Sequence, residues 1–156
     1  MKTTKLVKKL ISLGYTISFA ESCTGGLAVS SLIGINNSSK VIKESYVTYS
    51  EEAKMKLLGV KKDTLERHTV YSQEVAIEMA QGVANVAQST LGVGITGIAG
   101  PLGGTKDNPV GTVYFTIYNV KENKIHNYKK VFKIKIRNHI RKAASNYIIS
   151  KILEIL

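Results

Sequence analysis

The segment from Ser22 to Gly26 is the first stretch of the chain whose residue types could do chemistry. It reads Ser-Cys-Thr-Gly-Gly and joins an apolar, β-branched run to an amphipathic run. Glycine-rich turns let backbone N–H groups approach a ligand, and a helix N-terminus behind such a turn favours an anion. Two interpretations follow: an ordinary strand-to-helix turn with a Ser or Thr cap, or an anion-binding turn formed by Ser22, Thr24, Gly25 and Gly26.

Nucleophilic chemistry has two further candidates. Cys23 lies where a helix N-terminus would lower the pKa of a thiol, although a small packed side chain is the better interpretation of it. A lysine replaces histidine as a base when partial burial lowers its pKa, so Ser-Lys pairs carry out acyl transfer at neutral pH. Lys54 closely follows the strand-like residues 46–49, near the edge of a sheet where sites gather. Taken alone, however, Lys54 is typical of a surface residue and Ser39 of a helix N-cap.

Context argues against two other kinds of site. The G-x-G-x-x-G match at residues 92–97 lies inside a predicted strand and opens no helix, so it indicates close backbone packing instead of dinucleotide binding. His68, His126 and His139 stand far apart and lack acidic or Cys neighbours at ligand spacing. We therefore expect no metal and no cofactor.

Length, charge and cysteine content limit the class of protein. A chain of 156 residues with 44% hydrophobic residues predicts one domain over residues 1–156 with a sizeable core. No stretch approaches the roughly 18 apolar residues of a membrane span, and a single cysteine fits a reducing compartment, so we expect a cytoplasmic protein without membrane contact. The net charge of +11 is scattered over most elements. It predicts a basic surface that favours a small phosphorylated substrate over nucleic acid, and exposed strand edges favour a homodimer.

Hydrophobic patterning places the elements that must position these residues. It predicts helices at 3–13, 27–33, 51–58, 63–66, 73–88 and 138–156, and strands at 15–20, 46–49, 91–98, 111–120 and 124–135. Gly14, Gly34 and Gly59 are placed to end the first three helices, and Asp63 is the predicted N-cap of the fourth. The order predicts an α/β fold, a three-layer α/β/α sandwich with a mixed, mainly parallel sheet whose ligands bind at strand carboxyl ends.

Five segments, in this order and at this spacing, closely resemble the C-terminal domain of the CinA family. They are residues 20–26 (AESCTGG), 47–54 (VTYSEEAK), 72–80 (SQEVAIEMA), 96–104 (TGIAGPLGG) and 109–113 (PVGTV). The resemblance spans about residues 3–155. Stand-alone members, called PncC, are nicotinamide mononucleotide amidases that release ammonia and leave nicotinate mononucleotide. Longer members carry an additional N-terminal domain that we expect this chain to lack, so the resemblance implies a cofactor-independent amidase.

The resemblance places the family's Ser-Lys dyad on Ser39 and Lys54. In the mechanism that it implies, Lys54 takes the proton of Ser39, whose oxygen attacks the carboxamide, and water hydrolyses the acyl-enzyme. The two side chains should then lie within hydrogen-bond reach. Tyr49 is expected to orient the lysine or to stack on the cationic pyridinium ring; the alternative is an ordinary packed strand aromatic. We also predict that the backbone N–H groups of Gly25 and Gly26 face the same pocket as Ser39.

Three regions compete for the substrate phosphate. They are the turn at residues 22–26, a glycine-rich loop with Gly100, Gly103 and Gly104, and the arginines Arg137 and Arg141. Arg141 is the stronger arginine candidate, because the family's closing helix also carries an arginine at that place.

Two departures from the family pattern bear on these assignments. Asn37 stands where relatives commonly have Gly before the two serines, which predicts a different backbone angle. Val70-Tyr71 replaces the usual Ala-Val before the long helix, which predicts a reshaped pocket rim. An alternative function, favoured by the charge and by the altered turn, is a non-catalytic nucleotide- or nucleic-acid-binding module of the same fold. A third is amidase activity on a different small amide.

Overall fold

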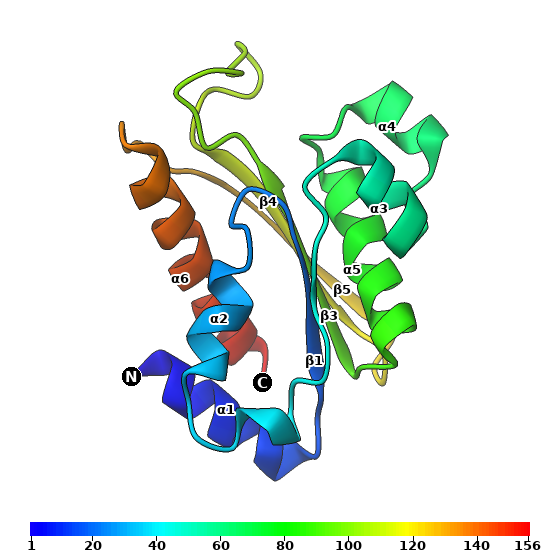
Figure 1. The fold of residues 1–156 in the computed structure, drawn as a ribbon, viewed down its shortest axis with the longest axis vertical. Helices are drawn as coiled ribbons and strands as arrows, with labels where there is room; N and C mark the ends of the chain where they lie inside the picture. Colours follow the sequence, from blue (N-terminus) through cyan, green and yellow to red (C-terminus); the bar gives the residue numbers. More distant parts are fainter.

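A five-stranded sheet lies between two layers of helices in the computed structural model, which describes residues 1–156 (Figure 1). The strands are β1 (Ile17–Glu21), β2 (Tyr46–Val47), β3 (Leu91–Gly97), β4 (Thr112–Asn119) and β5 (Lys124–Val131), in the spatial order β2-β1-β3-β4-β5. β1 pairs in parallel with β2 and β3, whereas β4 is antiparallel to both β3 and β5. Only β4 therefore opposes the common strand direction, and the predicted mixed, mainly parallel three-layer fold is confirmed.

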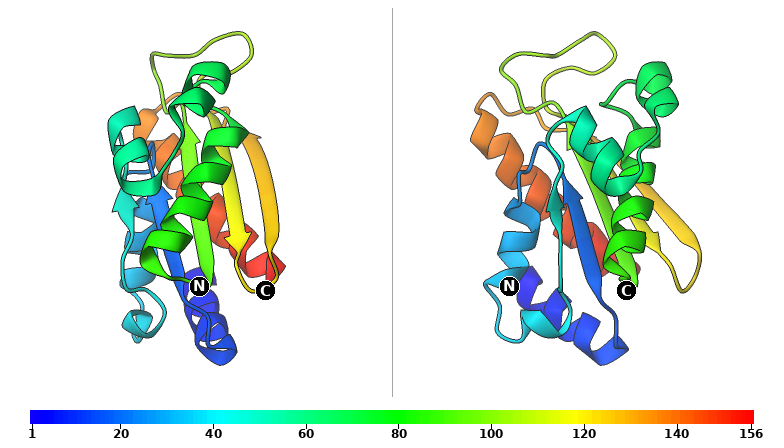
Figure 2. Two further views of the ribbon diagram at one scale, coloured as in Figure 1. Left: turned by 90° about the vertical axis from the view of Figure 1, so that its right-hand side faces the viewer. Right: turned by 45° about the vertical axis from the view of Figure 1, so that its right-hand side comes forward.

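Each face of the sheet is covered by three helices. One face carries α1 (Lys2–Leu13), α2 (Leu27–Ile33) and α6 (Arg137–Ile155), and the other carries α3 (Glu51–Leu58), α4 (Lys62–His68) and α5 (Gln73–Ala87) (Figures 1 and 2). A short 3-10 turn, η1 (Ser38–Lys40), follows α2 and lies beside α1. No helix has the length and apolar character that crossing a membrane would require.

Local signals fix most helix ends. Ser50 and Ser72 cap α3 and α5, because each hydroxyl accepts the backbone N–H three residues later. Gly59 ends α3 in the left-handed conformation, with φ of 70°, which costs a glycine little. The bounds of α2 and α3 agree with the prediction.

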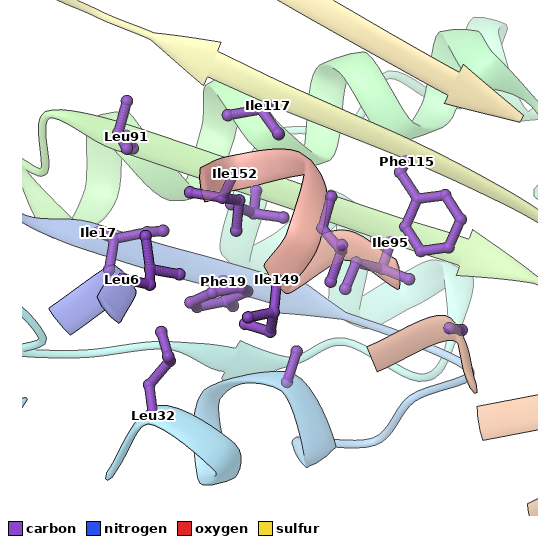
Figure 3. Packing of buried hydrophobic residues seen from close by; sticks show 14 of the residues in the cluster. Leu6, Ile17, Phe19, Leu32, Leu91, Ile95, Phe115, Ile117, Ile149 and Ile152 are labelled. Carbon is purple, nitrogen blue, oxygen red and sulfur yellow. The ribbon is translucent and has the colours of Figure 1, made fainter. Parts of the chain in front are cut away.

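Buried aliphatic and aromatic side chains join the sheet to α1, α2 and α6 (Figure 3). Phe19 of β1 and Phe115 of β4 are fully buried in this cluster, and Ile149 of α6 packs with them. On the other face the backbone of α5 approaches β3 so closely that a Cβ added at Gly94 would overlap the carbonyl oxygen of Ala76. The G-x-G-x-x-G match at residues 92–97 thus reflects close packing, as expected.

Three predicted boundaries are wrong for tertiary reasons. β5 ends at Val131 and not at residue 135, because Val131 pairs with Thr112, the first residue of its partner β4. β2 contains two residues and not four, although Thr48 N–H still donates to Glu21 O beyond its end. α4 begins at Lys62, before the predicted N-cap Asp63. Its start is tied to α5 instead, because the carboxylate of Glu78 accepts the N–H of Lys61 at 2.7 Å and also the hydroxyl of Thr64.

Candidate active site

The carboxyl ends of the three parallel strands meet at one edge of the sheet and enclose a cavity. Ser22 follows β1, Tyr49 follows β2 and Gly97 ends β3, while the loop at residues 98–111 rises above this edge (Figure 2). The cavity measures about 300 Å³ and is lined by Ser22, Cys23, Tyr49, Glu51, Val70, Tyr71, Gly97, Ile98, Ala99, Gly100, Leu102 and Arg137. Its volume suits one small ligand, because small-molecule pockets run from about 300 to 1,000 Å³.

Lys54 lies against this cavity with its side chain completely buried. Its Nζ donates to Ser22 Oγ at 3.1 Å, to Thr48 O at 2.7 Å and to Tyr49 O at 3.4 Å. The two carbonyl oxygens can only accept, so in a neutral amine they hold the two N–H groups and the lone pair is left for Ser22. The geometry therefore orients Lys54 as a base toward the Ser22 hydroxyl.

Burial also brings Lys54 closer to the neutral form. Because desolvation disfavours the ammonium ion, the pKa of Lys54 falls from an ordinary 10.5 to about 8. A lysine with this pKa exchanges its proton near neutral pH, as a general base must.

The predicted contact between Lys54 and Ser39 is wrong. Ser39 is exposed on η1, at the opposite edge of the sheet, where Val41 O accepts the N–H of Ile17 at the first residue of β1. Ser22 follows the last residue of β1, and a strand rises about 3.3 Å per residue, so the five positions from 17 to 22 span roughly 16 Å. Ser39 and Lys54 therefore lie at opposite ends of β1, and Ser22 is the serine that contacts Lys54.

We predicted that the turn after β1 presents its N–H groups to an external anion, and this is wrong for Gly25 and Gly26. The fully buried carboxylate of Glu21 accepts the N–H groups of Gly26 at 2.9 Å, Ala28 at 3.2 Å and Val29 at 2.9 Å. Gly25 N–H donates to Ser22 O at 3.0 Å. The expectation that Gly25 and Gly26 face the pocket of Ser39 is wrong, because an internal carboxylate already occupies the N-terminus of α2.

Two donors of the same turn have no backbone acceptor. Neither Cys23 N–H nor Thr24 N–H donates to a carbonyl, and these are the two residues after Ser22. The Cys23 thiol itself is a poor nucleophile, since burial raises its pKa from 9.0 to about 12. This agrees with the interpretation of Cys23 as a small packed side chain.

Arg141 contacts the turn and does not line the cavity. It donates from Nε to Cys23 O at 2.9 Å, from Nη2 to Thr24 O at 3.1 Å and from Nη1 to Asn138 Oδ1 at 3.0 Å. The prediction of Arg141 as the stronger phosphate ligand is therefore replaced by a role in holding residues 22–24 in place.

Arg137 is the arginine that lines the cavity. It donates to Gly100 O at 2.7 Å and to the Tyr49 hydroxyl at 3.0 Å. Tyr49 is 65% exposed, and Lys54 contacts its carbonyl and not its hydroxyl. Of the three loop glycines, Gly100 lines the cavity, whereas Gly103 and Gly104 lie on the exposed loop beyond it.

A larger cavity of about 510 Å³ lies elsewhere, between the end of α5 and the turn after β4. Its polar lining includes Gln81, Asn85 and Gln88, beside the Tyr118 ring. Its buried hydroxyl, Ser89, is bonded to Ser18 Oγ and Leu91 O with no base beside it, and its lysine, Lys121, is exposed. Chemistry is therefore better placed in the smaller cavity beside Lys54.

Comparison with known proteins agrees with this fold. The sequence model of the CinA C-terminal domain matches residues 2–156. The chain belongs to the CinA C-terminal domain family. Two solved structures resemble it over 99% of its length: a CinA superfamily protein from Escherichia coli (32% identity, TM-score 0.94, 88% of that chain) and a competence/damage-inducible protein from Agrobacterium tumefaciens (32% identity, TM-score 0.91, 95% of that chain).

Curated relatives of this family member are longer. A Clostridium kluyveri protein named as competence-damage inducible is 50% identical over 140 residues, which are 90% of this chain and 33% of that protein. A CinA-like protein of Kosmotoga olearia is 52% identical over 113 residues, which are 72% of this chain and 27% of that protein. The chain thus spans about a quarter to a third of the length of these relatives, and their names state no reaction.

Sequence reasoning missed two features of the site. The first is the role of Glu21 as an internal cap of α2. Its place directly before the turn at residues 22–26 was the signal, because helix N-termini attract carboxylates. Glu51 is the other: it lies in the cavity lining, on the first turn of α3, where charged side chains ordinarily point to solvent.

Proposed function

We propose that this protein is an amidase that deamidates nicotinamide mononucleotide to nicotinate mononucleotide and ammonia, with Ser22 as nucleophile and Lys54 as base. One observation carries the proposal: buried Lys54 Nζ lies 3.1 Å from Ser22 Oγ at the wall of a ligand-sized cavity. The membership of the CinA C-terminal domain family supports the choice of substrate. The nucleophile differs from the one that the sequence resemblance implied, because Ser39 lies at the other edge of the sheet.

The reaction begins with proton transfer from Ser22 Oγ to the neutral amine of Lys54. The oxygen attacks the carboxamide carbon, and the C=O electron pair moves onto the carbonyl oxygen to give a tetrahedral oxyanion. When the C–N bond breaks, its electrons go to the nitrogen, which takes the proton held by Lys54 and leaves as ammonia. Water then attacks the acyl-enzyme while Lys54 again accepts a proton. When the bond between the acyl carbon and Ser22 Oγ breaks, Lys54 returns this proton to Oγ, which restores Ser22 and releases the product, which ionises to the carboxylate.

Donors for the oxyanion are available directly after the nucleophile. Cys23 N–H and Thr24 N–H are not used by backbone carbonyls, and the N–H after a nucleophilic serine is a recurring oxyanion donor in other hydrolases. Arg141 contributes by positioning, since its bonds to Cys23 O and Thr24 O fix the direction of these peptide groups. A fixed donor costs no reorganisation when the charge develops.

The phosphate of the substrate is assigned to Arg137. Its guanidinium lines the cavity and uses only part of its five N–H donors on Gly100 O and the Tyr49 hydroxyl. The remaining donors suit a phosphate, which arginine binds through paired hydrogen bonds.

Ammonia release from a panel of amides tests the proposal. Purified protein is incubated with nicotinamide mononucleotide, nicotinamide riboside, nicotinamide and glutamine, and ammonia is measured together with the carboxylate product. We expect nicotinamide mononucleotide to be the preferred substrate by kcat/KM. Phosphate-dependent binding without ammonia from any of the four amides would reject the amidase and favour a nucleotide-binding module.

A further inference from the structure

The candidate active site contains one carboxylate. Glu51 is the only acidic residue that lines the cavity, and Arg137 is the only basic one. Glu51 is exposed at the first residue of α3 and makes no hydrogen bond or ion pair with another side chain. The helix does not need it as a cap, because the Ser50 hydroxyl accepts the N–H of Ala53 at 3.0 Å. The Glu51 carboxylate acts on Lys54 only through its charge, which works against the lowering of the Lys54 pKa by burial. It has no hydrogen-bond partner and is available to a ligand.

Two tyrosines share the cavity with Glu51. Tyr49 is held through its hydroxyl by Arg137 at 3.0 Å. Tyr71 is held through its carbonyl, which accepts from Asn108 Nδ2 at 3.2 Å, and Asn108 Oδ1 in turn accepts the hydroxyl of Tyr114 at 2.6 Å. Aromatic rings beside a carboxylate form a surface that attracts a flat cation, through the ring quadrupole and through charge.

We propose that Glu51 and Tyr71 are specificity-determining residues that select a positively charged heterocycle over its neutral counterpart. This deepens the proposed function and rests on it, because the ring of nicotinamide mononucleotide carries a positive charge while its phosphate is negative. The cavity has the same two charges, Glu51 and Arg137, on its lining. A neutral amide of similar shape would leave the Glu51 carboxylate without a partner.

The test compares two ligands that differ in ring charge. Nicotinamide mononucleotide has a cationic ring, and its dihydro form has a neutral ring with the same carboxamide, ribose and phosphate. Binding of both is measured by calorimetry in a Ser22→Ala background, in which neither ligand should be consumed. We expect the Ser22→Ala protein to bind the cationic form at least about fivefold more tightly, within the range measured for partly exposed ion pairs and cation–π contacts.

Glu52 provides the matched control. Glu51 and Glu52 are both exposed in the first turn of α3, but only Glu51 lines the cavity. Glu51→Gln should reduce the preference for the cationic form about fivefold with less than a twofold effect on the neutral form, whereas Glu52→Gln should leave the preference unchanged. Tyr71→Leu should reduce it about threefold, and Tyr71→Phe should retain it.

The proposal is overturned if Glu51→Gln weakens both ligands equally, if it changes neither, or if neither ligand binds. These outcomes are separate from the amidase test, because the binding preference is measured without turnover. Absence of ammonia with a Glu51-dependent preference would reject the reaction and retain the selectivity. Ammonia release with an unchanged preference in Glu51→Gln would retain the amidase reaction and reject the role of Glu51 in selectivity.

Discussion

Replacement of Glu21 by Gln tests whether an internal carboxylate, and not a bound anion, stabilises the N-terminus of α2. Glu21 Oε2 accepts the N–H groups of Gly26 and Ala28, and Oε1 accepts the N–H of Val29. A glutamine oriented to keep the first two bonds must point its amide nitrogen at Val29 N–H, so two donors face each other in a buried place.

The cost follows from these contacts. A buried N–H without an acceptor costs about 1–3 kcal/mol, and loss of negative charge at a helix N-terminus costs about 0.3–1 kcal/mol, or up to ~2 kcal/mol when partly buried. We therefore expect Glu21→Gln to lower the free energy of unfolding by about 2–4 kcal/mol. Because 1 kcal/mol shifts Tm by about 2–4 °C in domains of this size, Tm should fall by roughly 5–15 °C.

Urea unfolding followed by circular dichroism measures this change, with Glu52→Gln as a control of the same chemistry at an exposed position. The control should stay within about 0.5 kcal/mol of the parent protein. A Glu21→Gln protein as stable as the control would refute the internal cap and return the turn at residues 22–26 to the role of an open anion site.

Three further predictions concern the site directly. The neutral amine of Lys54 is the base, and burial lowers the pKa of Lys54 to about 8. Therefore kcat/KM should rise with pH through about 8 and level off above it. A flat or falling pH profile contradicts this assignment. Gly25→Ala should reduce turnover about tenfold, because its Cβ would lie 2.8 Å from Arg141 Nη2 and displace the side chain that holds Cys23 and Thr24. The control is Gly14→Ala, which is also left-handed but has open space around it and should keep full activity. Equal losses of activity in both variants would reject the positioning role of Arg141. Arg137→Gln should raise KM for nicotinamide mononucleotide about 10- to 100-fold, as expected of a charge-assisted phosphate contact. KM for nicotinamide riboside should change by no more than about threefold, the share that loss of the contact with Tyr49 would cause; a similar loss for both substrates argues against phosphate binding there.

Most of the fold could be predicted because its signals are local. Ser50, Gly59 and the apolar spacing between them fix α3 at both ends without help from the rest of the chain. The start of α4 could not be predicted in this way, since the carboxylate that ties it down, Glu78, comes from α5. Likewise the length of β2 depends on how far it pairs with β1.

The site was predicted in part. Lys54, Tyr49 and Arg137 were expected from the sequence and do meet at one edge of the sheet. The resemblance implies Ser39 as the nucleophile, whereas strand direction favours Ser22. Residues that follow parallel strands lie at the same edge of the sheet, and Ser22 follows β1 whereas Ser39 precedes β2. The capping carboxylate of Glu21 could not be assigned before the fold brought the N–H groups of residues 26–29 around it.

The most direct test of the central claim is a comparison of Ser22→Ala with Ser39→Ala in the release of ammonia from nicotinamide mononucleotide. If Ser22 and Lys54 form the catalytic pair, Ser22→Ala should lower kcat at least about 10³-fold, as loss of a nucleophile does, while Ser39→Ala retains at least half of it. Both variants should match the parent in circular dichroism and Tm. Full activity in Ser22→Ala, or loss of activity in Ser39→Ala alone, would contradict the account.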